Sequence, residues 1–196
     1  VIPWLARIPR RTGYRGEWRY GLINDMRPLD KSVLTQTAQR YVALGLEPGA
    51  DLPPREIPPP RLIVDIANQS RAVRALGVPG DRPLVGFMPG AEYGPAKRWP
   101  VENYAQTALA LAARGYRVCL FGSSRDAAVC REIGRLAGDA VLDLCGRTSL
   151  ADAIDLLAAT ELCVTNDSGL MHVAAAVGRP LVAIYGSSTP AYTPPR

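Results

Sequence analysis

A short segment near the end of the chain combines residues that can bind a phosphate group. Asp167, Ser168 and Gly169 follow an apolar run and open a predicted helix. The free backbone N–H groups and the positive dipole end of a helix N-terminus favour an anion such as a pyrophosphate. His172 lies one turn further along, on the same helix face as Ser168. The segment predicts an anion site, although taken alone it would more often be an ordinary N-cap followed by an interior histidine.

A second group of candidate ligands lies in the Gly/Pro-rich segment 89–100, PGAEYGPAKRWP. It contains Lys97, one of only two lysines in the chain, together with Gly90 and Arg98. A solvated surface lysine is the alternative, but so specialised a loop favours a ligand-binding role. The chain lacks GxxxxGK[ST], lacks GxGxxG at the first strand-to-helix turn and lacks GxSxG. The predicted site therefore binds phosphate by another scheme.

These candidate ligands follow segments with regular patterning, which starts at about residue 79. Short apolar runs predict strands at 84–88, 117–121, 141–145, 162–165 and 181–185. Helical spacing of apolar residues predicts helices at 101–114, 125–137, 149–159 and 168–177. Strands that alternate with helices of this length form right-handed crossovers in a parallel sheet, so the fold class is α/β.

The same topology predicts one shared cleft. In an open parallel sheet, ligands bind beyond the carboxyl ends of the strands. Small, flexible or polar residues follow the first, second, fourth and fifth predicted strands, at 89–100, 122–126, 166–172 and 186–188. We therefore expect these segments to meet at one phosphate-and-sugar cleft.

The first part of the chain differs in composition and patterning. Basic and aromatic residues surround a helix-like stretch near 30–44, and prolines crowd residues 48–61, which predicts a semi-rigid linker. The start, 1–4, lacks an initiator Met and resembles the middle of a strand, while 193–196 follows a strand with no closing helix. Both ends favour a fragment of a longer protein; a complete small protein with ragged ends is the alternative.

Composition limits the partners. The chain has 196 residues, 47% of them hydrophobic, enough for one domain and part of another. No apolar run reaches the length of about 18 residues that would span a bilayer. The formal net charge of +5, mostly from arginine, suits anionic ligands or an anionic membrane surface. It does not by itself indicate nucleic acid, because no basic helix or RNP-like aromatic pattern accompanies it.

The four cysteines are widely spaced and form no CxxC pair. They are Cys119, Cys130, Cys145 and Cys163, in apolar strand-like or helix-like runs. Zinc would need clustered ligands, so no metal site is predicted. We expect reduced cysteines in the core of a cytosolic protein.

Several longer strings closely resemble the bacterial ADP-heptose:lipopolysaccharide heptosyltransferases, with the type II enzymes as the best match. They are RTGYRGEWRYGLINDMRPLD (11–30), PGAEYGPAKRWP (89–100), FGSSRD (121–126), TNDSGLMHVAAAVGRPLVAIYG (165–186) and TPP (193–195). The resemblance implies the GT-B fold, in which two Rossmann-like domains face each other across a cleft. Residues 1–60 would be the C-terminal part of the acceptor-binding domain and a Pro-rich linker. Residues 61–196 would be the nucleotide-sugar-binding domain, truncated at its end.

The resemblance also implies an activity. Members of the family move a heptose from ADP-L-glycero-D-manno-heptose to the inner-core heptose of lipopolysaccharide, with inversion and without a metal. The implied partners are ADP-heptose and a lipid A–Kdo–heptose acceptor, with no cofactor and no nucleic acid. The implied location is the cytoplasmic, inner face of the inner membrane, where a peripheral protein could contact anionic lipid.

Position by position, the resemblance assigns Lys97 to the charge on the leaving diphosphate. The other implied donor-binding residues are Gly90 and Ala91 (backbone close to the donor), Asp126 (ribose), Thr148 (adenine), and Asp167, Ser168, Gly169 and His172 (pyrophosphate and heptose). The family's general base is an Asp that precedes the first residue here, and neither Asp25 nor Asp30 is assigned to that role. Without a base a loss of about 10²–10⁴-fold in rate is expected, so this chain should bind rather than turn over.

Two alternatives remain open from the residues. One is another nucleotide-sugar enzyme of the same fold, such as a type I or III heptosyltransferase or an epimerase-like protein. The other is a non-catalytic α/β module that binds nucleotides without a preference for the sugar. The arginines at positions 7, 10, 11, 15 and 19 could contact a phosphorylated acceptor or the inner leaflet, or form an ordinary basic surface.

Overall fold

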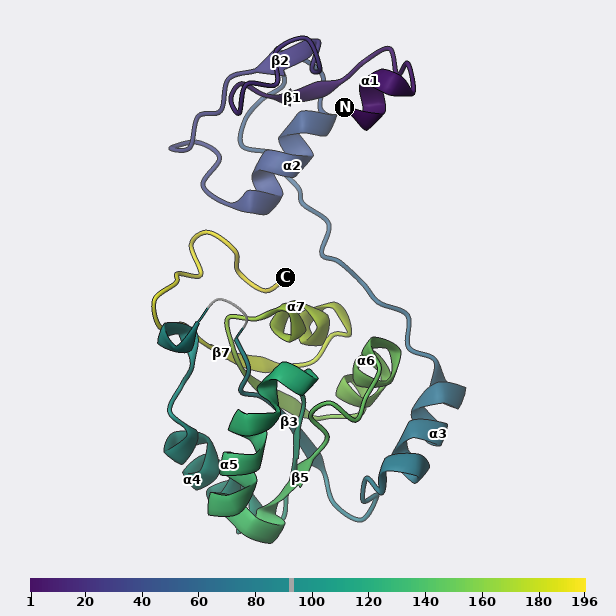
Figure 1. Ribbon diagram of the computed structural model, residues 1–196, viewed down its shortest axis with the longest axis vertical. Coiled ribbons are helices and arrows are strands. Elements are labelled where there is room, and N and C mark those ends of the chain that lie inside the picture. Colours follow the sequence, from purple (N-terminus) through teal and green to yellow (C-terminus); the bar gives the residue numbers. More distant parts are fainter. Residues whose placement is uncertain (92–93) are drawn as a thin grey trace. The chain divides into compact units, whose positions relative to one another are not determined.

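The computed structural model describes residues 1–91 and 94–196 and divides the chain into two compact units (Figure 1). Unit 1 comprises Val1–Pro58 and Pro190–Pro194, and unit 2 comprises Pro59–Thr189 and Pro195–Arg196. The Pro-rich stretch between them, residues 46–65, contains no helix or strand. Proline fixes φ and removes a backbone donor, which accounts for the irregular path.

Unit 2 is built on a five-stranded parallel sheet, as predicted. Its strands are β3 (Leu84–Met88), β4 (Arg117–Leu120), β5 (Val141–Asp143), β6 (Leu162–Asn166) and β7 (Leu181–Ile184). Their order across the sheet is β5-β4-β3-β6-β7. After β5 the chain returns past β3 to place β6 on its other side, so the direction of winding changes between β3 and β6. The α/β fold class is confirmed.

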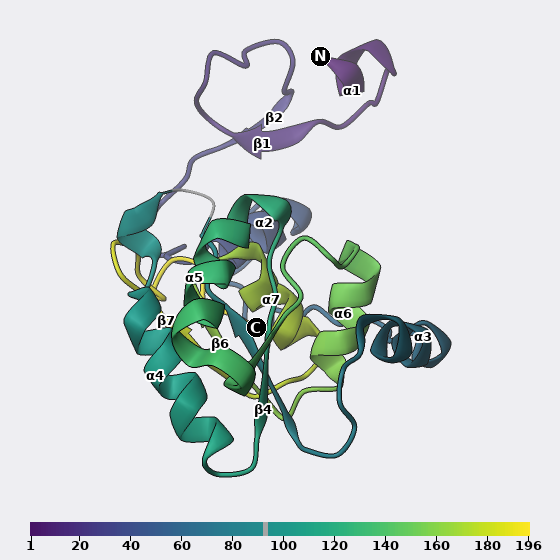
Figure 2. The same cartoon turned by 60° about the horizontal axis from the view of Figure 1, so that its bottom comes forward.

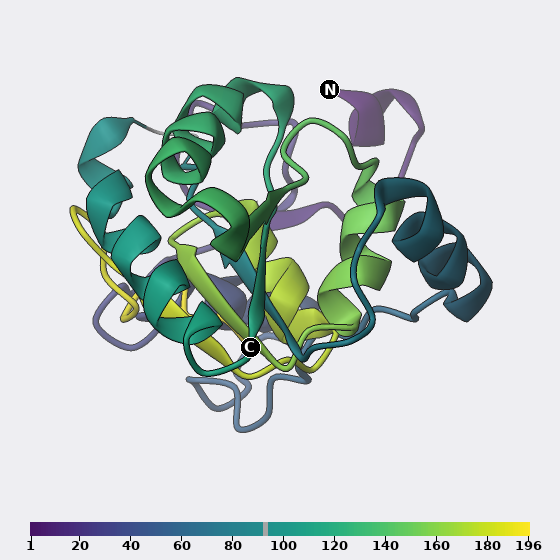
Figure 3. The same cartoon turned by 90° about the horizontal axis from the view of Figure 1, so that it is seen from below.

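Helices cover both faces of this sheet. They are α3 (Ile66–Leu76), α4 (Val101–Ala112), α5 (Ala127–Ala137), α6 (Leu150–Ala158) and α7 (Gly169–Ala176). Figures 2 and 3 show α4 and α5 together on one side of the sheet, with α3 and α6 on the other. Each side has its own core: Tyr104 and Ile133 pack on Val85 and Phe87, whereas Leu157 of α6 packs with Cys163 on the opposite face.

Local signals explain the helix boundaries. Ser149 and Asp152 form the capping box that opens α6, as the sequence indicates. Helix α3 is not predicted from the sequence, although it carries ordinary caps. Asp65 accepts hydrogen bonds from two N–H groups of its first turn, and Gly77 closes it in the left-handed conformation, with φ of 68°. The sequence pattern did not indicate α3 because the helix follows the prolines directly and is polar in composition.

Unit 1 contains short elements: α1 (Ile2–Leu5), the parallel pair β1 (Thr12–Tyr14) and β2 (Asp25–Arg27), and α2 (Thr37–Gly45). The strand predicted at the start of the chain is wrong, because a proline in the first turn fits a helix N-terminus and α1 forms there. Helix α2 begins later than the predicted residue 30. A turn at Asp30–Val33, held by the Asp30 carboxylate, precedes it.

Two groups of side-chain contacts hold unit 1 together. The carboxylate of Asp25 accepts hydrogen bonds from Arg27, Thr12 and Arg10, which lower its pKa to about 2. The returning segment Pro190–Pro194 packs on α2 through Tyr192. The Arg40 guanidinium donates to the Tyr192 hydroxyl (2.7 Å), and the Tyr192 carbonyl accepts from the first N–H of α2 (3.1 Å).

The expectation of four reduced cysteines is wrong. Cys130 of α5 and Cys145, just after β5, form a disulfide, while Cys119 and Cys163 are free and buried. The two bonded residues are 15 positions apart, so no short motif marked them. Both belong to the core on the α4–α5 side of the sheet, where packing of α5 on β5 brings their Cα atoms to 6.5 Å.

Within residues 1–91 and 94–196, none of the helices combines the length and the apolar composition needed to cross a bilayer.

Candidate functional site

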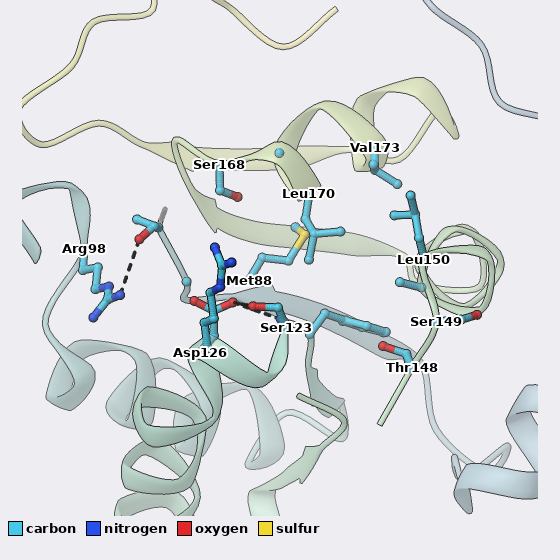
Figure 4. A pocket seen from close by; sticks show the side chains of 17 residues that line it. Met88, Arg98, Ser123, Asp126, Thr148, Ser149, Leu150, Ser168, Leu170 and Val173 are labelled. Atoms are coloured by element: carbon cyan, nitrogen blue, oxygen red, sulfur yellow. Dashed lines mark hydrogen bonds between the residues drawn. The ribbon is translucent and has the colours of Figure 1, made fainter. Parts of the chain in front are cut away.

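A cavity of about 690 Å³ opens at the carboxyl ends of β3, β4 and β6 in unit 2. This is the point where the winding direction of the sheet changes, the usual ligand site of open α/β sheets. Its volume lies in the range of small-ligand and cofactor sites. Figure 4 shows side chains from both sides of the sheet converging on it, with Ser123 and Asp126 below and Ser168 and Leu170 above.

Backbone forms one wall, where Gly90 and Ala91 follow β3 after a single proline. A Cβ atom added to Gly90 would lie 2.4 Å from Oδ1 of Asp126. Only glycine therefore fits while the Asp126 carboxylate keeps its position. Gly90 and Asp126, which the sequence assigns to the donor site from different segments, pack directly against each other.

The Asp126 carboxylate also organises the turn that follows β4. Its Oδ2 accepts hydrogen bonds from the backbone N–H (2.9 Å) and the hydroxyl (2.8 Å) of Ser123, a capping box on the 3₁₀ turn Ser124–Asp126 (Figure 4). The predicted helix 125–137 thus starts as this turn and continues as α5. The turn holds the carboxylate at the cavity wall.

Lys97 forms an ion pair with Asp167, whose Oδ2 lies 2.6 Å from the ammonium nitrogen. Both side chains are largely buried, with exposed fractions of 22% and 10%. Desolvation raises the pKa of the Asp167 carboxyl, but the Lys97 ammonium together with Ser188 and His172 outweighs it, and the net pKa lies below its usual value. The structure therefore joins two predicted site residues that are 70 positions apart. Neither Lys97 nor Asp167 lines the cavity itself. Glu92 and Tyr93, in the loop that contains Lys97, lie outside the described residues.

The buried amide of Asn166 fixes the loops around this ion pair. Its Nδ2 donates to the Pro89 carbonyl (2.7 Å), and its Oδ1 accepts from the Trp99 N–H (3.0 Å) and the Tyr104 hydroxyl (3.1 Å). Both Asn166 and Tyr104 are fully buried. One side chain at the end of β6 thus ties the segment after β3 to the segment after Lys97.

The start of α7 has the arrangement expected for an anion site. Ser168 occupies the N-cap position, but its side chain makes no capping hydrogen bond. Ser168 and Gly169 both line the cavity. His172 is exposed and does not line the cavity. The simpler alternative, a capping serine followed by an interior histidine, does not describe this segment.

Of the predicted site residues, the cavity lining includes Gly90, Ala91, Asp126, Thr148, Ser168 and Gly169. It also includes residues that the sequence reasoning did not assign to the site. Two are cations, Arg98 and Arg125, which adjoin assigned residues along the chain. Three are small or polar, Gly122, Ser123 and Ser149, and the rest form an apolar wall: Met88, Phe121, Leu150, Ala153, Leu170 and Val173. Their positions at strand ends and on helix faces could have indicated them only once the sheet order was known.

One cluster among the described residues has the spacing of metal ligands, formed by Cys130, Asp143 and Cys145. The two sulfur atoms are bonded to each other, and Asp143 accepts a hydrogen bond from the Cys145 N–H (2.9 Å). Metals bind thiolates, so the oxidised pair offers no such ligand.

Comparisons with known proteins point to one family. The sequence model of glycosyltransferase family 9 (heptosyltransferase) matches residues 1–196. The chain is 47% identical over 203 residues to lipopolysaccharide heptosyltransferase 2 of Salmonella typhimurium, and 45% identical over 203 residues to that of Escherichia coli K12. Each alignment covers 100% of this chain and 58% of the relative. The chain therefore spans somewhat more than half the length of these relatives.

Solved structures give the same result. The structure of E. coli ADP-heptose LPS heptosyltransferase II superposes with a TM-score of 0.89 at 45% identity, covering 99% of this chain and 61% of that one. A family 9 glycosyltransferase from Veillonella parvula gives a TM-score of 0.80 at 24% identity, covering 97% and 55%, which supports the fold.

Proposed function

The chain belongs to glycosyltransferase family 9, the heptosyltransferases, and from this premise we propose that it forms part of an enzyme that adds a heptose to the inner core of lipopolysaccharide. The donor is ADP-L-glycero-D-manno-heptose, the acceptor is the heptose of a lipid A–Kdo–heptose unit, and ADP leaves with inversion. The observation that carries the proposal is the identity of 45–47%, over the whole chain, to proteins named lipopolysaccharide heptosyltransferase 2.

The two ends of the cavity support a nucleotide-sugar donor. In the view of Figure 4, Thr148, Leu150 and Val173 lie at one end, whereas Ser168 lies nearer the other. Apolar side chains beside a hydroxyl suit a purine base, so this end takes the adenine. Asp126, between the ends, takes the ribose hydroxyls.

The diphosphate lies against the start of α7 in this proposal. Free N–H groups at Ser168 and Gly169, and the positive end of the helix dipole, favour its negative charge. Lys97 leaves Asp167 and neutralises the oxygen on which charge develops as ADP departs. Asp167 repels a diphosphate, so once released it accepts hydrogen bonds from hydroxyls of the heptose, with His172 beside the same subsite.

Catalysis by the donor site then rests on electrostatics. Cationic and N–H donors placed where charge develops stabilise a departing diphosphate, and we propose that the transfer needs no metal. The acceptor hydroxyl also needs a general base, and no residue of this chain is assigned to that role. We propose that the 196-residue chain alone binds donor without turnover.

Unit 1 is the proposed acceptor side. Its segment 15–20 carries basic residues beside aromatic ones, and Trp18 is 91% exposed. Such a surface suits a phosphorylated, lipid-anchored acceptor or anionic headgroups, with about 1 kcal/mol of attraction for each basic residue near an anionic membrane. The proposed location is the cytoplasmic face of the inner membrane.

Titration calorimetry of the chain with ADP-heptose, ADP and UDP-N-acetylglucosamine tests the donor assignment. We expect saturable binding of ADP-heptose that exceeds both comparison ligands and falls at least tenfold, about 1.4 kcal/mol, in Lys97→Ala. Lys31→Ala is the matched control, because Lys31 is the other lysine of the chain, is exposed and belongs to unit 1.

The outcomes separate the alternatives. Tighter binding of the uridine sugar would replace heptose by another donor within the same fold. Equal binding of ADP and ADP-heptose would indicate a nucleotide-binding module that does not recognise the sugar. A folded chain that binds none of the ligands, with circular dichroism as the check on folding, would reject the site.

A further inference from the structure

Arg98 brings to the cavity a cation that the proposed roles do not use. It follows Lys97 directly, yet Arg98 lines the cavity and Lys97 does not. In Figure 4 it lies at the opposite end from Thr148 and Leu150, on the side where Ser168 is found. Its side chain is therefore at the end that the proposed function gives to the phosphates.

Within residues 1–91 and 94–196, the Arg98 guanidinium uses little of its hydrogen-bonding capacity. Its Nη2 donates to the Ala91 carbonyl at 3.4 Å, a long bond drawn as a dashed line in Figure 4. Its Nε is buried and has no acceptor within the part of the chain that the structure describes. A buried N–H group without an acceptor bears the cost of its lost hydration, so such groups in native proteins normally have a partner. An arriving anion would supply one.

The charges around the site also favour Arg98 as a phosphate ligand. Lys97 and Asp167 form a close pair, so together they present no net charge to a ligand. Among the described residues that line the cavity, the charged ones are Arg98, Arg125 and Asp126. A nucleoside diphosphate brings at least two negative charges, more than Lys97 can neutralise alone. A planar guanidinium binds a phosphate through two parallel N–H bonds, whereas an ammonium acts as a point charge.

We propose that Arg98 binds the diphosphate of the donor through its Nε and one Nη group, as a second cation beside Lys97. This inference rests on the proposed function, because it names a further residue of the same donor site. In the free chain the bond to Ala91 holds the guanidinium against the segment that follows β3 and the Nε is covered, so the guanidinium turns towards the phosphate when the donor binds. Arg98 thus determines affinity for the phosphates and leaves the adenine end unaffected.

Calorimetric titration with ADP, AMP and adenosine tests this assignment in the unmodified chain, Arg98→Ala, Arg98→Lys and the control Arg131→Ala. Arg131 is exposed on α5 and does not line the cavity, so this variant removes the same charge from the same unit. We expect ADP affinity to fall at least tenfold in Arg98→Ala. In Arg98→Lys it should fall severalfold, because lysine keeps the charge but loses the two parallel N–H bonds of the guanidinium. Adenosine affinity should stay within twofold in all variants.

The readouts distinguish failure of this inference from failure of the proposed function. If the unmodified chain binds ADP and Lys97→Ala weakens it, but Arg98→Ala stays within twofold, the role of Arg98 is wrong and the donor site stands. Equal weakening of ADP and adenosine by Arg98→Ala would show a structural role and also overturn the inference, with Arg98→Lys separating lost charge from lost packing. An unmodified, folded chain that does not bind ADP would reject both.

Discussion

Replacing Asn166 by alanine tests how the donor site is held in place. The side chain is fully buried, and its loss leaves the Pro89 carbonyl, the Trp99 N–H and the Tyr104 hydroxyl without their partner. Each buried group left unsatisfied costs about 1–3 kcal/mol. Water entering the vacated space can partly satisfy them, so we take the lower end for each and expect about 3 kcal/mol in total. In a chain of this size that lowers Tm by about 6–12 °C.

A second substitution isolates one of these bonds. Tyr104→Phe removes only the hydroxyl and keeps the ring between Phe87 and Trp99, so it should cost about 1 kcal/mol. In the Asn166→Ala background the same change should cost almost nothing, because the hydroxyl there has already lost its acceptor. The double-mutant cycle should therefore give a coupling energy of about 1 kcal/mol.

Urea unfolding followed by tryptophan fluorescence measures these values. The chain has three tryptophans, and Trp4 and Trp18 belong to unit 1, where they are exposed. Changing both to phenylalanine leaves Trp99 as the reporter of unit 2. Asn103→Ala, at a partly buried position of α4, is the control and should stay within about 0.5 kcal/mol. An Asn166→Ala variant no less stable than Tyr104→Phe would refute the reasoning.

Three further predictions follow from other contacts. Gly90→Ala should weaken ADP binding at least about tenfold in calorimetry, because its Cβ would lie 2.4 Å from the Asp126 carboxylate and displace it. Thiol titration under denaturing, non-reducing conditions should find two free thiols. Reduction of the Cys130–Cys145 bond, which spans 15 positions, should cost about 3 kcal/mol in urea unfolding. The lowered pKa of Asp25, about 2 against an ordinary 3.8, stabilises unit 1 above pH 4. This contribution should be lost as the pH falls towards 2, and acid titration by circular dichroism should show a weaker pH dependence in Asp25→Asn.

Much of unit 2 could be predicted because its sequence signals are local. Apolar runs between glycines and prolines predict β3 and β6 to within a residue, and a capping box marks the start of α6. The strand predicted at 141–145 is shorter because Asp143 binds the backbone N–H of Cys145 with its side chain and turns the chain there. Side-chain competition of this kind depends on a rotamer, which hydrophobic periodicity does not report.

The sequence predicts which segments contribute to the candidate site, but not which of their residues contact one another. Motifs identified Gly90 and Asp126 separately, whereas their packing against each other depends on the order of β3 and β4 in the sheet. The pairing of Lys97 with Asp167 crosses 70 positions, and no spacing rule connects them. Arg98 lies in the same motif as Lys97, but only the folded loop shows that it lines the cavity while its neighbour does not.

The return of Pro190–Pro194 to unit 1 has a consequence for how the protein is made. Unit 1 is discontinuous in sequence, since Tyr192 supplies the hydroxyl and the carbonyl that Arg40 and the first turn of α2 use. A ribosome adding about 5–20 residues per second needs on the order of 10 s to pass from residue 58 to residue 190. Throughout that interval α2 lacks its last partner, while the whole of 59–189 emerges and can fold. Unit 1 is thus completed only after the 59–189 segment that interrupts it has been synthesised.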